Sequence, residues 1–193
     1  MVTPVNEQAR LESLINYAVL DTDFEESFDR ITRLAAKLFD TEISVVSLVD
    51  KDRQWFKSVV GLDARETPRN IAFCAHAILN DEVFEISDAQ EDDRFKSNPL
   101  VTGAPFIRFY AGAPLKSSDG HNLGTFCIID SDDRKPLNKV EKEVLEDFSK
   151  LVVELLETRK IANESSMRFL KIDQELDILK SSSNKIKLTA SFA

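Results

Sequence analysis

Residues 107–115 read IRFYAGAPL and residues 123–130 read LGTFCIID, and these two stretches decide the fold class. Both are rich in the β-branched and aromatic residues that favour strands. The connection between them contains Asp119-Gly120, a pair that favours a tight reversal of the chain. The sequence therefore predicts an antiparallel hairpin over residues 107–130.

A second hairpin is predicted over residues 43–60. The stretch ISVVSLV at 43–49 has the alternating, β-branched pattern of a strand, and another strand is expected from Gln54 to Val60. Only four residues, 50–53, separate the two strands. Because parallel neighbours need a crossover of a dozen or more residues, these strands must run antiparallel.

Helical patterns lie on both sides of the hairpin at 43–60. Residues 6–20 predict a short amphipathic helix, and apolar residues at helical spacing predict another over 23–39. Thr22 and Glu25 have the spacing of a capping box at the start of the second helix. Residues 71–80 predict a short, largely buried helix.

The segment between the hairpins becomes irregular after this buried helix. A short strand is expected from Val83 to Ile86, and residues 88–105 are polar with no clear period. A long, weakly structured segment inside a compact domain is more often a functional loop or lid than a plain connection.

A long helical pattern begins at Leu137. Eleven positions step by alternating four and three, and nine are apolar: 144, 148, 151, 155, 158, 162, 165, 169, 172, 176 and 179. This spacing predicts a coiled coil between two chains. The alternative is that residues 137–160 cover the sheet while 161–193 fray or fold back. Ser181 to Asn184 interrupts the pattern, and residues 183–193 are predicted to be disordered.

Composition excludes several classes of function. The formal net charge is −9, with 20 basic and 30 acidic side chains before residue 161 and no local basic patch, so nucleic acids and anionic membranes are not expected partners. No stretch approaches the ~18 apolar residues of a membrane span. Two cysteines and an N-terminus without a secretory pattern indicate a reducing, cytoplasmic setting.

The order of these predicted elements resembles the layout of a GAF domain. The similarity covers about residues 10–160, in the family's order. It is carried by the segments SLVD at 47–50, RQWF at 53–56, FCAHAI at 73–78, DA at 88–89, DRF at 93–95, RFYAGAPL at 108–115 and GTFCIID at 124–130.

The resemblance implies an α+β, profilin-like fold with a central antiparallel sheet of five or six strands. The N- and C-terminal helices would pack on one face, and residues 70–105 would shelter a small-molecule pocket on the other. We expect a GAF-like sensory domain at 6–160, a helical coiled-coil signalling extension at 161–182 and the tail at 183–193.

The resemblance also implies a regulatory role. Bacterial GAF domains usually precede histidine kinases, diguanylate cyclases or transcriptional activators, so a downstream kinase or cyclase domain and a homodimer through the terminal helices are the expected partners. The sequence favours a sensor that is not itself an enzyme. A dimerisation or protein-interaction module without a ligand is the alternative, and a redox enzyme of the free methionine sulfoxide reductase type is a third class.

The family layout points seven side chains towards the sheltered face: Trp55, Phe73, His76, Arg94, Phe95, Phe109 and Tyr110. Aromatic walls with one or two polar anchors suit a small, partly apolar or planar ligand. For each aromatic residue, the competing interpretation is ordinary core packing. For His76, it is a structural role in which the imidazole hydrogen-bonds to the backbone.

The sequence motifs that bind specific ligands in other members of the family are missing from this chain. Cys74 beside His76 is compatible with tetrapyrrole attachment, but further chromophore-binding motifs are missing. The Asn-Lys-Phe-Asp-Glu pattern of cyclic-nucleotide-binding members is also missing, and the acidic run 91–93 lacks the spacing of a metal loop. Cys127 is expected to fill core space. The expected ligand is therefore an unidentified small molecule, with neither tetrapyrrole, cyclic nucleotide nor metal favoured.

Overall fold

The computed structural model describes residues 2–190, and their side chains as far as residue 180. The chain divides into two compact units, Met1–Leu156 and Glu157–Ala193. No helix in the described part of the chain combines the length and the apolar composition needed to cross a membrane.

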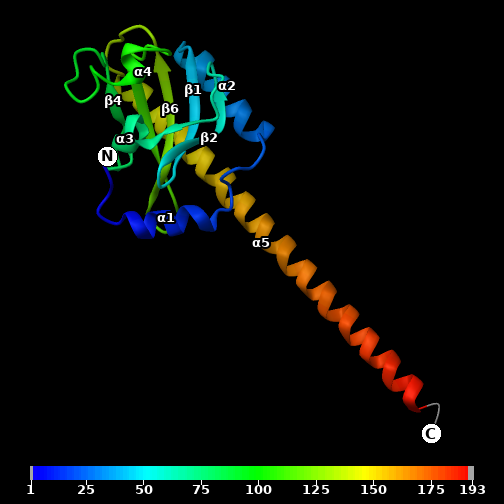
Figure 1. Ribbon diagram of the computed structural model, residues 1–193. Coiled ribbons are helices and arrows are strands. Elements are labelled where there is room, and N and C mark those ends of the chain that lie inside the picture. The colour runs from blue at the N-terminus through cyan, green and yellow to red at the C-terminus, as the bar shows by residue number, and fades with distance from the viewer. Residues whose placement is uncertain (1, 191–193) are drawn as a thin grey trace. The chain divides into compact units, whose positions relative to one another are not determined.

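The first unit is built on one six-stranded antiparallel sheet with the strand order β3-β2-β1-β6-β5-β4 (Figure 1). Its strands are β1 Ile43–Val49, β2 Arg53–Val60, β3 Glu66–Pro68, β4 Phe84–Ile86, β5 Phe109–Lys116 and β6 Asn122–Asp130. Both predicted hairpins are confirmed, as β1–β2 and β5–β6. The pairing of β1 with β6 joins them into a single sheet.

Helices α1 Glu7–Asn16 and α2 Glu26–Phe39 and the first turns of α5 cover one face of this sheet. They bury a continuous apolar core with the strands. Phe28 of α2 and Leu145 of α5 are fully buried there, and the ring of Phe126 on β6 stacks on Phe148 of α5 with centroids 5.4 Å apart. The predicted arrangement of terminal helices on one face is confirmed.

Short elements cover the opposite face. They are the 3₁₀ helix η1 Arg69–Ile71, α3 Cys74–Ala77 and α4 Pro99–Thr102, with the loops between them. The helix predicted over 71–80 is much shorter than expected, because Ala72 adopts an extended backbone that separates η1 from α3.

The capping box predicted at Thr22 and Glu25 does not form, and α2 begins only at Glu26. Both side chains instead bind the ammonium group of Lys57, at 3.0 Å and 2.6 Å from its Nζ. Lys57 is fully buried at an irregularity in the β1–β2 register. A buried charge must be paired to be tolerated, so this contact uses the groups that would otherwise cap the helix.

Helix α5 runs from Lys139 to Ala190 and continues through the serine-rich stretch where the sequence predicted an end to the helical pattern. Disorder predicted for residues 191–193 lies outside the described residues. In the second unit the helix carries exposed apolar side chains at 161, 167, 169, 170, 172, 176, 178 and 179.

Candidate functional site

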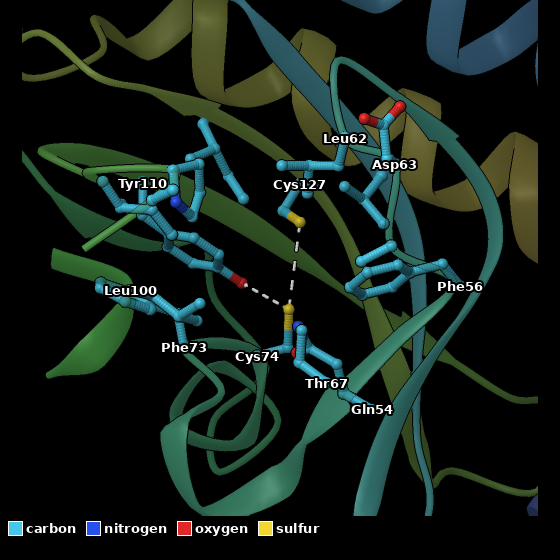
Figure 2. A pocket seen from close by; sticks show the side chains of 16 residues that line it. Gln54, Phe56, Leu62, Asp63, Thr67, Phe73, Cys74, Leu100, Tyr110 and Cys127 are labelled. Carbon is cyan, nitrogen blue, oxygen red and sulfur yellow. Dashed lines mark hydrogen bonds between the residues drawn. The ribbon is translucent and has the colours of Figure 1, made fainter.

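A cavity of about 240 Å³ lies on the sheet face opposite the terminal helices. Strands β1, β2, β5 and β6 form one wall, with Val45, Phe56 and Ile129 among its side chains. Leu62 from the loop after β2 and Leu100 from α4 complete the lining (Figure 2). The lining is almost entirely apolar.

Strand alternation decides which side chains reach the cavity. Gln54 and Phe56 on β2 line it, whereas Trp55 between them belongs to the core under the helices. On β5, Tyr110 lines the cavity and Phe109 points to the helices. The prediction that Trp55 and Phe109 face the sheltered side is therefore wrong, because successive side chains of a strand point to opposite faces.

Of the seven predicted residues, Phe73 and Tyr110 line the cavity. Phe95 stacks on Phe73 with centroids 4.1 Å apart, and the ring of His76 meets the edge of Phe95 at 4.8 Å. The Arg94 guanidinium lies 5.4 Å from the centre of the Phe95 ring. Phe95, His76 and Arg94 thus form a layer that supports Phe73 rather than the cavity lining itself.

Charge in this outer layer is balanced locally. Arg94 donates to both carboxylate oxygens of Asp92, at 2.9 Å and 2.6 Å. Partial burial lowers the pKa of His76, and the nearby Arg94 cation lowers it further. His76 is therefore best described as a neutral aromatic partner of Phe95 near neutral pH.

Two polar atoms on the cavity lining have no hydrogen-bond partner among the described residues. They are Oε1 of Gln54 and Oγ1 of Thr67, on the paired strands β2 and β3. A buried acceptor without a donor costs about 1–3 kcal/mol. Both atoms are themselves almost fully buried, so a donor group in the cavity would reach them only after a small shift of the surrounding side chains.

Two thiols also meet at the cavity. The sulfur atoms of Cys74 and Cys127 are 3.9 Å apart, and the Tyr110 hydroxyl donates a hydrogen bond of 3.3 Å to the Cys74 sulfur (Figure 2). Gly112 makes this position of Tyr110 possible: a Cβ atom at residue 112 would lie 2.3 Å from the Tyr110 hydroxyl.

The two thiols are electrostatically different. Burial raises the pKa of Cys74, but hydrogen bonds from Cys127 and the surrounding hydroxyl groups outweigh it and lower the pKa to about 6. The hydrogen bond to Cys74 and burial both raise the pKa of Cys127 well above its usual value. The pair therefore loses its first proton from Cys74.

A buried ion cluster connects the two sides of the sheet. Glu7 of α1 accepts hydrogen bonds from Arg10 at 2.7 Å and from Arg69 at 2.5 Å, and both guanidinium groups are buried. Burial raises the pKa of Glu7, but the bonds from Arg10 and Arg69 outweigh it and lower the pKa to about 2. Arg69 lies in η1, just before Phe73, so the cluster ties helix α1 to the segment that covers the cavity.

The described architecture agrees with a comparison against known families. The family model of the GAF domain matches residues 23–155. The chain belongs to the GAF domain family.

One relative of this GAF domain is part of a bacterial phosphodiesterase. The chain is 43% identical over 160 residues to the cyclic di-GMP phosphodiesterase PA2567 of Pseudomonas aeruginosa, an alignment that covers 83% of the chain and 27% of that protein. The chain therefore spans about a quarter of the relative's length.

Solved structures confirm the fold. The GAF domain of an Acinetobacter phosphoenolpyruvate-protein phosphotransferase has a TM-score of 0.58 at 13% identity, covering 79% of this chain and 94% of that one. The free methionine-R-sulfoxide reductase of Neisseria meningitidis has a TM-score of 0.59 at 16% identity, covering 84% and 98%. At such low identity the likeness establishes the fold alone.

Sequence reasoning missed two of the residues that line this GAF cavity and did not bring two others together. Gln54 and Thr67 are polar residues within strands, and period-two alternation from Phe56 places Gln54 on the cavity face. Cys74 and Cys127 are the two cysteines behind the redox-enzyme alternative, but 53 positions separate them in the chain. No local pattern in the sequence indicates that their sulfurs meet.

Proposed function

We propose that this GAF domain is a regulatory sensor that binds a small molecule in the cavity and passes the signal through helix α5 in a homodimer. The cavity itself is the observation that carries the proposal. The short helices and loops leave a hollow of about 240 Å³, partly open at the surface and lined by apolar side chains, and two polar atoms of its lining residues have no partner within the part of the chain that the structure describes. A ligand in this hollow would remove its apolar lining from water and supply a hydrogen-bond partner, and both effects favour binding.

The lining defines the chemistry of the ligand. A small and largely apolar molecule would fill the hollow against Phe56, Phe73 and Tyr110. One N–H or O–H group of the ligand would face Oε1 of Gln54 and Oγ1 of Thr67. The ligand is an unidentified organic molecule, neither a tetrapyrrole nor a cyclic nucleotide, and it is bound without being chemically changed.

A short physical route leads from the cavity to α5. Cys127 lines the cavity, and its neighbour Phe126 points to the opposite face and stacks on Phe148 of α5. A ligand that displaces β6 thus acts directly on the helix. Any such switch requires that the ligand bind one of two states more tightly than the other.

The exposed stripe of α5 supports the dimer. Phe169, Ile172, Leu176 and Leu179 continue the alternating spacing of a coiled-coil seam, and all four are exposed in a single chain. A second copy of the same helix would bury them.

The output of the module is proposed from its relative. Because the chain is 43% identical to part of a cyclic di-GMP phosphodiesterase, we place it upstream of an output domain that acts on a cyclic dinucleotide, within a cytoplasmic protein. A kinase or cyclase output, implied by the family, is distinguished by which output domain the full-length gene encodes.

Mass spectrometry of protein purified from its own host tests ligand binding. Native spectra are expected to show an added small mass that is released on denaturation, and Gln54→Leu is expected to lose it. Gln90→Leu, the same exchange at an exposed site, serves as the control and keeps the ligand. A native mass equal to that of the bare chain, with no stabilisation by any small molecule screened, would support the ligand-free dimerisation module instead.

Analytical ultracentrifugation tests the dimer separately. Leu176→Glu places a charge in the seam and is expected to yield monomers. Leu170→Glu makes the same exchange at an exposed position outside the seam and should leave the dimer intact. A wild-type protein that sediments as a monomer at all concentrations would contradict signalling through a dimer.

A further inference from the structure

The Cys74–Cys127 pair has a geometry that ligand binding does not require. Both side chains are buried, with 2% and 1% of their surface exposed, and both sulfurs adjoin the cavity. Their separation of 3.9 Å exceeds the length of a disulfide bond, about 2.05 Å, by roughly 1.9 Å. Rotation of two short side chains covers such a gap, so a bond between α3 and β6 needs little movement of the backbone.

The surroundings make one sulfur the nucleophile. The Tyr110 hydroxyl donates to Cys74, and the hydroxyls of Tyr110 and Thr125 lie 3.4 Å apart, so Thr125 completes the polar group around the sulfurs. Donors directed at a sulfur stabilise its thiolate, which is the reactive form. The lowered pKa of Cys74 and the raised pKa of Cys127 agree with this assignment.

We propose that Cys74 and Cys127 are a reversible oxidation site for a small neutral hydroperoxide that enters the cavity. The Cys74 thiolate attacks one peroxide oxygen and the O–O bond breaks. Cys74 becomes a sulfenic acid, and the departing oxygen takes up the proton that Cys74 had lost, leaving as water or an alcohol.

The second thiol completes the reaction. The sulfur of Cys127 attacks the sulfur of Cys74, the S–O bond breaks, and the hydroxide leaves as water with the Cys127 proton. The peroxide is reduced by two electrons and the two thiols are oxidised to one disulfide. An external dithiol restores the reduced pair.

Formation of the disulfide would alter the lining of the cavity. It ties α3 to β6, beside Tyr110, and Cys127 is adjacent to the Phe126 that packs on α5. Oxidation therefore acts at the same point as the proposed ligand but needs no bound molecule. The two proposals are independent, since a ligand can bind a protein whose thiols never oxidise.

The experiment uses the full chain and hydrogen peroxide. Intact-mass measurement is expected to record the loss of two hydrogens, and unreduced peptide mapping one intramolecular link between the Cys74 and Cys127 peptides, reversed by dithiothreitol. In Cys127→Ser, a dimedone-type reagent should trap a sulfenic acid at Cys74. In Cys74→Ser, thiol loss should slow by about tenfold or more.

A further variant separates activation from simple proximity. Tyr110→Phe removes one donor to Cys74 while keeping the ring, and peroxide-dependent oxidation is expected to slow by about threefold or more. A melting curve confirms that this variant folds. The proposal is overturned if wild-type protein yields only intermolecular disulfides or separate sulfinic acids, or if Cys74→Ser oxidises at the wild-type rate. The peptide map of the wild type decides the matter even where a variant does not fold.

Discussion

The two faces of the sheet are built from the same strands and differ in how completely they are filled. On the helix face, Phe126 and Phe148 stack within a continuous core. On the opposite face the same strands border a cavity of about 240 Å³. The difference lies in the covering elements, because long helices present regular apolar stripes whereas α3 and α4 have four residues each.

Specific contacts keep the irregular cover in place. The Asn98 side chain donates to the carbonyl oxygen of Ile71 at 2.9 Å, and Phe73 stacks on Phe95. These contacts hold the cover over the hollow without filling it. One sheet can therefore support a stable core on one side and a binding site on the other.

The largest expected effect comes from truncating one phenylalanine on each face. Phe126→Ala should lower the free energy of unfolding by about 4 kcal/mol, because it opens a cavity in a packed core. Phe56→Ala should cost about 2 kcal/mol, since one side of its ring already borders empty space. Urea unfolding followed by circular dichroism measures both values. Equal losses would mean that the hollow is closed in solution.

The next effect tests the link between the faces. Glu7→Gln should destabilise the domain by about 3 kcal/mol at neutral pH, because it leaves two buried guanidinium groups without their carboxylate. Since the pKa of Glu7 falls from 4.5 to about 2 on folding, its contribution is present above pH 4.5 and is lost as the pH falls towards 2.

Denaturation measured at several pH values checks this prediction. The wild type should lose stability below pH 4.5 more steeply than Glu7→Gln. Glu12→Gln on the exposed side of the same helix is the matched control and should follow the wild type. If Glu7→Gln retains the full acid dependence, the ionisation of Glu7 does not stabilise the domain through this cluster.

Much of the fold followed from local patterns. Period-two stretches and short turns predicted the hairpins at 43–60 and 107–130, and helical spacing predicted α1, α2 and the start of α5. The site is less accessible to such patterns: the family resemblance implies Trp55 and Phe109 as site residues, whereas strand alternation places both under the helices.

Other features depend on tertiary contacts that no local pattern encodes. Thr22 and Glu25 have the spacing of a capping box, yet the buried Lys57 on a distant strand takes both side chains. In the same way, Cys74 and Cys127 meet only because α3 lies over β6. The sequence shows which residues are charged or contain a thiol, but only the fold shows which groups they contact.

A smaller effect concerns the position of Tyr110 on the cavity face. Gly112→Ala should destabilise the domain by about 2 kcal/mol, because the new methyl group would lie 2.3 Å from the Tyr110 hydroxyl. Combining it with Tyr110→Phe removes part of the clash, so the two losses should not add. Additive losses in a double-mutant cycle would show that Tyr110 does not lie over Gly112.

The smallest effect compares polar side chains on the two faces. Gln54→Leu should change the free energy of unfolding by less than about 1 kcal/mol, because it removes an acceptor that has no donor and adds apolar surface to an apolar wall. Ser58→Ala on the helix face should cost about 1–2 kcal/mol, since the Ser58 hydroxyl hydrogen-bonds with Thr32 and Asp29.

Thermal and urea unfolding of these two variants distinguishes a binding-site residue from a residue that stabilises the fold. Removing a polar group that stabilises the fold through packing or a hydrogen bond lowers the free energy of unfolding, as expected for Ser58. Removing a polar group that contacts only a ligand weakens ligand binding but leaves the free energy of unfolding unchanged, and Gln54 should behave in this way. A large loss of stability in Gln54→Leu would assign its side chain to the fold, and the cavity would then lack its proposed anchor.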